Sequence, residues 1–188
     1  AFEYTRDRII ISTKTQAQTA EGFWKDLEES LSKMKTDYID IYQFHNPAFC
    51  PKPGDESGLY DAALEAKRQG KIRHIGITNH RISVAREAIE SGLYETLQFP
   101  FSYLAAAADL EIVEQCKEAG MGFIAMKSLP GGLIHNSAAA YAYMAQPQFA
   151  HTAAIWGIQR ESELDEFLSY QTCPPQFEGE LLAEIEAD

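Results

Sequence analysis

The sequence predicts an α/β fold, the (β/α)8 TIM barrel, with the 188 residues covering about six of its eight βα units. Apolar runs and helical stretches alternate with a period of about thirty residues, which is typical of parallel strands joined by crossover helices. The runs are apolar on both faces, as strands covered by helices must be. A doubly wound sheet is the alternative, but no G-x-G-x-x-G follows the first strand.

Each element has its own signal in the sequence. The predicted strands cover residues 8–14, 38–45, 72–78, 96–101, 122–128 and 152–158. Phe23, Leu27, Leu31 and Met34 recur at helical spacing after the first strand, and a loop with three prolines follows the second. Further helices are predicted over 59–69, 82–90, 110–119, 138–144 and 162–170, several of them ended by glycine. We expect Ser162 to cap the last of these.

The composition excludes several classes of protein. The net charge of −12 disfavours nucleic acid and anionic membranes as partners. No apolar run approaches the ~20 residues of a membrane span. The three cysteines form no C-x-x-C pair, which favours a reduced chain in the cytoplasm. We expect residues 1–170 to form the barrel, incomplete at its N-terminus, and residues 171–188 to form an acidic helical tail.

Polar residues gather where the predicted strands end, and this edge holds the chemistry in both candidate architectures. Lys14 ends the first strand and His45 the second, while Asn79 and Gln98 belong to the next two. Such side chains are costly to bury unless they are paired. Taken singly, Lys14 can extend into solvent from the rim, His45 can be a core histidine and Asn79 can shape a turn. Lysine and histidine on consecutive units are the sharper signal of an active site.

Five segments carry a resemblance to a known family. The strings IISTKT, TDYIDIYQFHN, GKIRHIGITNH, LQFPFSYL and FIAMKSLPGG, in this order, resemble the aldo-keto reductase family up to about Tyr170. The resemblance implies a (β/α)8 barrel that binds NADP(H) or NAD(H) and transfers hydride reversibly between the nicotinamide and a small carbonyl substrate. It predicts neither the particular carbonyl compound nor the oligomeric state.

The resemblance also implies roles for individual residues. Lys14 and His45 match two members of the catalytic tetrad: the ammonium lowers the pKa of a catalytic tyrosine, and the histidine polarises the carbonyl. Thr78, Asn79 and Gln98 would hold the carboxamide, and Met126 would pack under the nicotinamide ring. The implied cofactor-binding residues are Thr78, Asn79, Gln98, Met126, Lys127, Ser128, Leu129, Gly131, Gly132, Gly157, Gln159 and Glu163, and no metal site is expected.

The chain departs from the family pattern at two places. The tetrad's Asp and Tyr are expected upstream of Ala1, so the chain alone is expected to be inactive and not to form a stable monomer. Gly157 and Glu163 stand where NADP-preferring members place a Lys and an Arg, which leaves the choice between NADPH and NADH open. The MKSLPGG segment and the tail resemble a subgroup with a C-terminal iron–sulfur extension, although Cys173 alone cannot hold a cluster.

Two other functions remain open from the sequence. Lys14 or Lys127 can form a Schiff base in a barrel enzyme of aldolase type. A chain without the catalytic tyrosine can also be a pseudo-reductase, a non-catalytic subunit that binds the cofactor.

Overall fold

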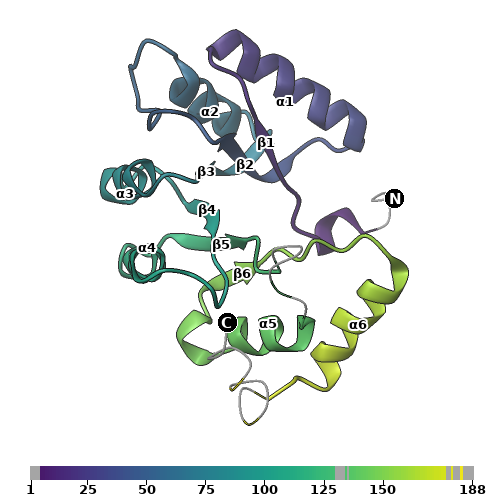
Figure 1. Ribbon diagram of the computed structural model, residues 1–188. Coiled ribbons are helices and arrows are strands. Elements are labelled where there is room, and N and C mark those ends of the chain that lie inside the picture. The colour runs from purple at the N-terminus through teal and green to yellow at the C-terminus, as the bar shows by residue number, and fades with distance from the viewer. Residues whose placement is uncertain (1–4, 130–133, 135, 177–178, 180–182, 184–188) are drawn as a thin grey trace. The chain divides into compact units, whose positions relative to one another are not determined.

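The computed structural model describes residues 5–129, 134, 136–176, 179 and 183 (Figure 1). The chain divides into two compact units. Unit 1 consists of Ala1–Gln98 with Glu118–Met121, and unit 2 of Phe99–Lys117 with Gly122–Asp188. Strands and helices alternate in each unit, as the sequence predicts.

Unit 1 is built from parallel strands in chain order. β1 pairs with β2, β2 with β3, and β3 with the part of β4 that lies in this unit. A short 3-10 helix, η1, precedes them. The elements are η1 (Arg6–Arg8), β1 (Ser12–Thr15), α1 (Ala20–Met34), β2 (Ile39–His45), α2 (Leu59–Arg68), β3 (Ile72–Thr78), α3 (Ile82–Ser91) and β4 (Thr96–Pro100).

Unit 2 repeats the pattern with shorter elements. β5 and β6 pair in parallel, and each is followed by a helix. The elements are α4 (Ala107–Glu118), β5 (Gly122–Met126), α5 (Ser137–Met144), η2 (Pro147–Phe149), β6 (Thr152–Ala154) and α6 (Glu161–Thr172). The observed strands therefore confirm the predicted α/β class and the predicted number of βα units.

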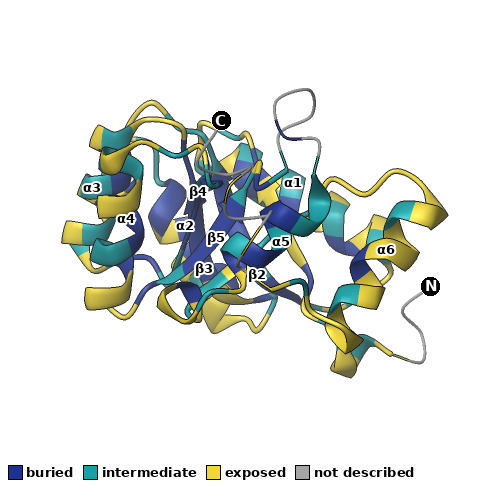
Figure 2. Cartoon of the chain, turned by 60° about the horizontal axis from the view of Figure 1, so that its bottom comes forward, coloured by how far each residue is buried: buried dark blue, intermediate teal, exposed yellow. Residues whose placement is uncertain are grey.

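Each unit has its own aromatic core. In unit 1 the buried ring of Phe23 on α1 lies 5.3 Å from the ring of Tyr42 and 6.1 Å from that of Phe44, both on β2. In unit 2 the ring of Phe101 lies 5.9 Å from Phe123 and 5.3 Å from Phe149. Figure 2 shows the strands largely buried, whereas α3 and α4 each carry exposed residues along one side. Burial of these rings stabilises both units.

The glycine stop signals are confirmed at the helix ends. Gly70 follows α2 with φ +75°, and Gly92 follows α3 with φ +64°. A left-handed residue at this position ends a helix, and glycine adopts it without a steric penalty.

Two details of the last βα unit differ from the prediction. β6 ends at Ala154 rather than at residue 158. The Ile155 N–H still donates to the Ala125 carbonyl of β5, and a tight turn follows in which the Ile158 N–H donates to the Trp156 carbonyl. Ser162 does not cap α6. The helix begins at Glu161, and the Glu163 carboxylate accepts the backbone N–H groups that precede it.

The C-terminal part of the chain follows α6. That helix ends at Thr172, and most of the predicted tail, including Leu181, Leu182 and Ile185, lies outside the described residues. Within the described part of the chain, every helix is too short or too polar to cross a lipid bilayer.

Candidate active site

Lys14 and His45 lie on adjacent strands and on the same face of the sheet in unit 1. Tyr42 and Phe44 contact Phe23 of α1, so the alternating side chains of β2 place His45 on the opposite face, away from the helices. β1 is in register with β2, with Lys14 opposite Gln43, which shares that face with His45. The predicted placement of the lysine and the histidine on neighbouring strands is therefore confirmed. We call this face the inner face.

The strand register extends the inner face to two more predicted residues. His45 lies opposite Thr78 of β3, and Thr78 lies opposite Gln98 of β4. Both side chains are buried. Four parallel strands therefore bring Lys14, His45, Thr78 and Gln98 together at their carboxyl ends, the edge at which barrel enzymes carry their active sites.

Gln43, two residues before His45 on β2, connects strands of unit 1 through side-chain hydrogen bonds. Its Nε2 donates to Ser12 Oγ on β1 and to Gln98 Oε1 on β4, at 3.0 Å each. Gln43 is only 2% exposed, and its Oε1 has no hydrogen-bond partner within the described residues. Gln43 was not among the predicted site residues. Its position two residues before His45 on the same strand face is the signal that identifies it.

Gly76 of β3 leaves the room that Gln43 needs. A Cβ atom at Gly76 would lie 2.9 Å from Gln43 Cγ and 2.3 Å from Thr96 Oγ1. Any larger residue here would have to displace both side chains. The glycine is therefore part of how the inner face is built.

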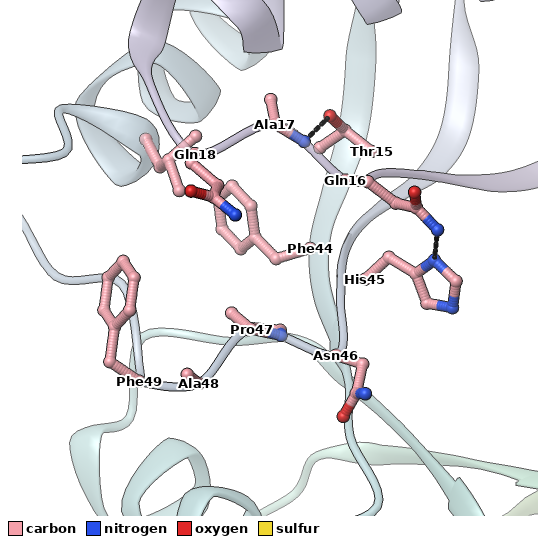
Figure 3. Close-up of a pocket in the computed structure, with 11 residues that line it drawn as sticks. Thr15, Gln16, Ala17, Gln18, Phe44, His45, Asn46, Pro47, Ala48 and Phe49 are labelled. Atoms are coloured by element: carbon pink, nitrogen blue, oxygen red, sulfur yellow. Dashed lines mark hydrogen bonds between the residues drawn. The ribbon is translucent and has the colours of Figure 1, made fainter.

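His45 has a polar side-chain partner, Gln16, that was also not among the predicted site residues. Gln16 Nε2 lies 3.0 Å from His45 Nδ1 (Figure 3). Burial lowers the pKa of His45 below its ordinary value, and the nearby charges of Lys14 and His80 lower it further. The imidazole is therefore neutral at pH 7.

A pocket of about 390 Å³ lies beside these residues in unit 1. The segments 15–18 and 44–49 line it together with Leu59. Figure 3 shows the rings of Phe44 and Phe49 on one side of the labelled group, whereas the His45 ring points away from them. The pocket is thus apolar at the end where Phe44 and Phe49 lie. The backbone around His45 bounds its other end.

Asn79 shapes the loops next to the inner face. Its Oδ1 accepts the N–H groups of His80 and Arg81, and its Nδ2 donates to the Pro47 carbonyl at 2.9 Å. Thr78 Oγ1 accepts the Asn46 N–H at 3.2 Å. These bonds fasten the loop after β3 to the loop that follows His45.

In unit 2, the predicted residues after β5 differ in accessibility. Lys127 is exposed and has a left-handed backbone with φ +59°, an uncommon conformation for a residue with a side chain. Ser128 is buried, and its hydroxyl lies 3.0 Å from the Phe101 carbonyl. Met126 and Leu129 are partly exposed, and the predicted Gly131 and Gly132 lie outside the described residues.

The remaining predicted residues lie before and within the start of α6. Gly157 and Gln159 are exposed. Glu163 Oε2 accepts the N–H of Gln159 at 2.7 Å and that of Arg160 at 3.1 Å, and Glu163 Oε1 lies 3.6 Å from the Arg160 guanidinium. The positive end of this helix thus already has a carboxylate from the chain itself.

The described residues contain no group of three or more His, Cys, Asp or Glu side chains arranged to hold a metal ion.

The sequence model of the Aldo/keto reductase family matches residues 2–172. The chain is 32% identical to the uncharacterized oxidoreductase YrpG of Bacillus subtilis over 121 residues, which cover 61% of this chain and 36% of YrpG. It is 37% identical to the methylglyoxal reductase DkgB of Salmonella typhi over 89 residues, which cover 45% of this chain and 32% of DkgB. The chain thus spans about a third of the length of these relatives.

Solved structures support the fold. The thermostable aldo-keto reductase Tm1743, in complex with the inhibitor epalrestat, superposes with a TM-score of 0.72 at 20% identity. The match covers 98% of this chain and 73% of that chain. Together with the six parallel strands, this likeness confirms the predicted partial (β/α)8 barrel.

Proposed function

Because the chain belongs to the aldo/keto reductase family, we propose that it is part of an NAD(P)H-dependent oxidoreductase that reduces a small aldehyde or ketone. The observation that carries this proposal is the pairing of Lys14 and His45 at the ends of adjacent strands, on a face that also bears Thr78 and Gln98. The similarity to a methylglyoxal reductase supports a small carbonyl compound as substrate.

We propose that His45 binds the carbonyl oxygen. A neutral imidazole donates one hydrogen bond, and a donor aimed at this oxygen stabilises the negative charge that develops on it during hydride attack. The lowered pKa of His45 keeps the ring neutral. Lys14 supplies a positive charge at the same edge, where it favours ionisation of a neighbouring tyrosine that delivers the proton.

The proton donor and its partner complete the proposed tetrad. We propose that the family's Tyr and Asp come from residues upstream of Ala1, so that the 188 residues by themselves have little reductase activity. Reading the coding sequence that precedes Ala1 tests this directly.

The inner face fits the carboxamide end of a nicotinamide. A carboxamide both donates and accepts hydrogen bonds, and so do the side chains of Thr78 and Gln98. Asn79 Nδ2 donates one hydrogen to the Pro47 carbonyl, and we propose that its second hydrogen binds the carboxamide. The buried Gln43 Oε1, without a partner within the described residues, is an acceptor of the kind that a bound group satisfies. When bound, the nicotinamide supplies the hydride.

In unit 2 we propose that the backbone of residues 126–132 binds the pyrophosphate, with Met126 under the nicotinamide ring. Gly157, Gln159 and Glu163 are proposed to lie at the adenosine ribose. Glu163 caps its own helix, so its negative charge opposes a 2′-phosphate there. We therefore propose no strong preference for NADPH over NADH.

Three further assignments are proposals that rest on the resemblance and on composition. We propose that the protein works in the cytoplasm, that residues 171–188 form a tail outside the barrel, and that the chain belongs to the subgroup with a C-terminal iron–sulfur extension. Sequencing beyond Asp188 for a cysteine-rich segment tests the last of these.

The proposed function is tested with the full-length natural protein. NADPH and NADH oxidation is followed with methylglyoxal and other small carbonyl compounds, for the wild type, Lys14→Met and His45→Gln. We expect each variant to lose activity by a factor of about 10²–10⁴. The matched control is Lys25→Met, which removes an exposed ammonium from α1 and is expected to leave activity unchanged.

The two rival functions predict different results. A Schiff-base enzyme would be trapped covalently on Lys14 or Lys127 by borohydride in the presence of substrate, which the proposed reductase would not be. A pseudo-reductase would bind the cofactor and reduce none of the carbonyl compounds.

A further inference from the structure

Gln16 contacts the proposed carbonyl-binding histidine but has no role in the function proposed above. It follows β1 directly and stands two residues after Lys14. Its Nε2 lies 3.0 Å from His45 Nδ1, and Figure 3 shows the amide group directed at that edge of the ring. The second ring nitrogen, Nε2 of His45, points away from Gln16 in the same view.

The chemistry of the two atoms fixes the direction of this hydrogen bond. A side-chain amide nitrogen carries two hydrogens and accepts no hydrogen bond, so Gln16 is the donor and His45 Nδ1 the acceptor. A neutral imidazole that accepts at Nδ1 has its proton on Nε2. The contact therefore determines which ring nitrogen is able to donate to a substrate.

We propose that Gln16 is a positioning residue for carbonyl reduction: it holds His45 in the tautomer with the proton on Nε2 and turns that N–H toward the substrate carbonyl. This inference rests on the proposed function of His45. In the opposite tautomer, Nε2 would present a lone pair to the carbonyl oxygen. The lone pair would repel this oxygen and would not polarise the carbonyl.

The backbone around Gln16 is anchored on both sides. The Thr15 hydroxyl donates to Asp26 Oδ2 on α1 at 2.5 Å and accepts the Ala17 N–H at 2.9 Å. Thr15 is only 2% exposed. Its side chain thus ties the turn after β1 to α1 and places the exposed Gln16 side chain next to the ring.

The charged surroundings of His45 give the tautomer its importance. Lys14 on β1 and His80 after β3 are the charged and titratable groups that act on the ring. Together with burial they disfavour the doubly protonated imidazolium. A neutral imidazole has a single N–H. The Gln16 amide selects which ring nitrogen carries this proton, and it therefore decides whether His45 donates to the substrate.

The first test is a spectroscopic one on the full-length natural protein. The ¹⁵N resonances of the His45 side chain, assigned by their loss in His45→Gln, report which ring nitrogen is protonated. We expect a protonated Nε2 and an unprotonated Nδ1 in the wild type. Gln16→Leu should produce a mixture of the two tautomers. Gln16→Glu should reverse the proton to Nδ1 and raise the pKa of His45, because a carboxylate accepts and carries negative charge.

Gln18→Leu is the matched control for the spectra. Gln18 lies in the same loop, but Figure 3 draws the hydrogen bond to the His45 ring from Gln16 and none from Gln18. The tautomer should be the same in Gln18→Leu as in the wild type. A wild-type Nδ1 that carries the proton, or a tautomer that Gln16→Leu leaves unchanged, would overturn the inference.

The second test is kinetic and separates this inference from the proposed function. Gln16→Leu should lower kcat/KM by about three- to tenfold, as expected for loss of one uncharged hydrogen bond, and Gln16→Glu should move the acidic limb of the pH profile upward. A wild-type protein that reduces no carbonyl contradicts the proposed function, while the spectra still decide whether Gln16 sets the tautomer. An active protein with unchanged kinetics and tautomer in Gln16→Leu contradicts this inference alone.

Discussion

The two units hold their predicted site residues in different ways. In unit 1, the strand register itself places Lys14, His45, Thr78 and Gln98, and buried side-chain bonds from Gln43 join three of the four strands. In unit 2, the corresponding residues lie beyond short strands, and Lys127, Gly157 and Gln159 are exposed. Paired strands therefore position the proposed catalytic groups, whereas loops and a helix start present the proposed cofactor-phosphate residues.

Because the two units hold their residues differently, mutations in them should have different effects on stability. A side chain fixed by several buried bonds cannot be changed without leaving some of its partners unsatisfied, which costs stability. A loop residue in solvent has few partners to lose. We expect substitutions of the buried, hydrogen-bonded side chains of unit 1 to change both stability and function. Substitutions of the exposed predicted residues of unit 2 should change ligand binding with little effect on stability.

The largest effect is expected at Asp40, at the start of β2. Its carboxylate accepts the Ile11 N–H at 2.9 Å and pairs with Arg6 at 2.8 Å and Arg73 at 2.9 Å, and only 5% of the residue is exposed. Asp40→Asn should lower the free energy of unfolding by about 2–4 kcal/mol, because it leaves buried donors poorly satisfied beside β1. Urea unfolding measures this loss.

The matched control lies in unit 2. Asp165→Asn on α6 removes the same charge from an exposed position, and its expected change is within about 0.5 kcal/mol. Equal losses in the two variants would contradict the contrast between the units.

Asp40 should also make stability depend on pH in the acid range. Burial alone would raise the pKa of Asp40, but the Ile11 N–H and the charges of Arg6 and Arg73 outweigh it and lower the pKa. The stabilisation is therefore fully present above the unfolded pKa of about 3.9 and is lost as the pH falls through the lower folded pKa. The difference in unfolding free energy between wild type and Asp40→Asn should shrink as the pH falls below about 4. A constant difference between pH 6 and pH 2 would contradict this account.

A smaller loss of stability is expected when Gly76, whose surroundings are crowded, is replaced by alanine. Gly157, whose surroundings are open, is the matched control. Gly76→Ala puts a Cβ 2.3 Å from Thr96 Oγ1 and 2.9 Å from Gln43 Cγ, whereas Gly157 has no atom within 4 Å of its Cβ position. Gly76→Ala should cost about 1–3 kcal/mol of stability through overpacking and should weaken nicotinamide binding by displacing Gln43. Gly157→Ala should leave the unfolding free energy unchanged. Thermal unfolding of both variants, with a cofactor titration of the first, checks the prediction, and a stable Gly76→Ala with normal binding would contradict it.

The same contrast explains which features the sequence predicted well. Strand 72–78 was predicted with its exact bounds, and Lys14 and His45 were placed on adjacent strands, because apolar runs and glycine stops are local signals that packing reinforces. Pairing of the strands fixes which residues lie opposite each other. The sequence position of a residue at a strand end therefore predicts where it lies in the sheet.

The features that were missed depend on contacts between distant residues. Gln43 and Gln16 owe their roles to partners on other strands, Gln98 and His45. The alternation along β2 places Gln43 on the face of His45 but does not reveal its partners, and no local pattern marks Gln16. The prediction of Ser162 as the cap was wrong, because a serine near the start of a helix has only a propensity to cap it. Here the longer Glu163 side chain reaches back to the same free N–H groups and takes its place.

A small loss of stability, together with a change in cofactor preference, is expected from Glu163. Its carboxylate caps α6 through the N–H groups of Gln159 and Arg160 and lies beside the Arg160 guanidinium. Glu163→Gln keeps an acceptor for these groups but removes the negative charge and releases Arg160. We expect a loss of about 0.5–1 kcal/mol in stability and a three- to tenfold gain, on the order of 1 kcal/mol, in the affinity for NADPH relative to NADH. Glu161→Gln removes a charge from the same helical turn without these contacts and should change the cofactor preference much less. Titration of both cofactors with full-length protein checks this. An equal shift in the two variants would mean that overall charge, and not the capping carboxylate, sets the preference.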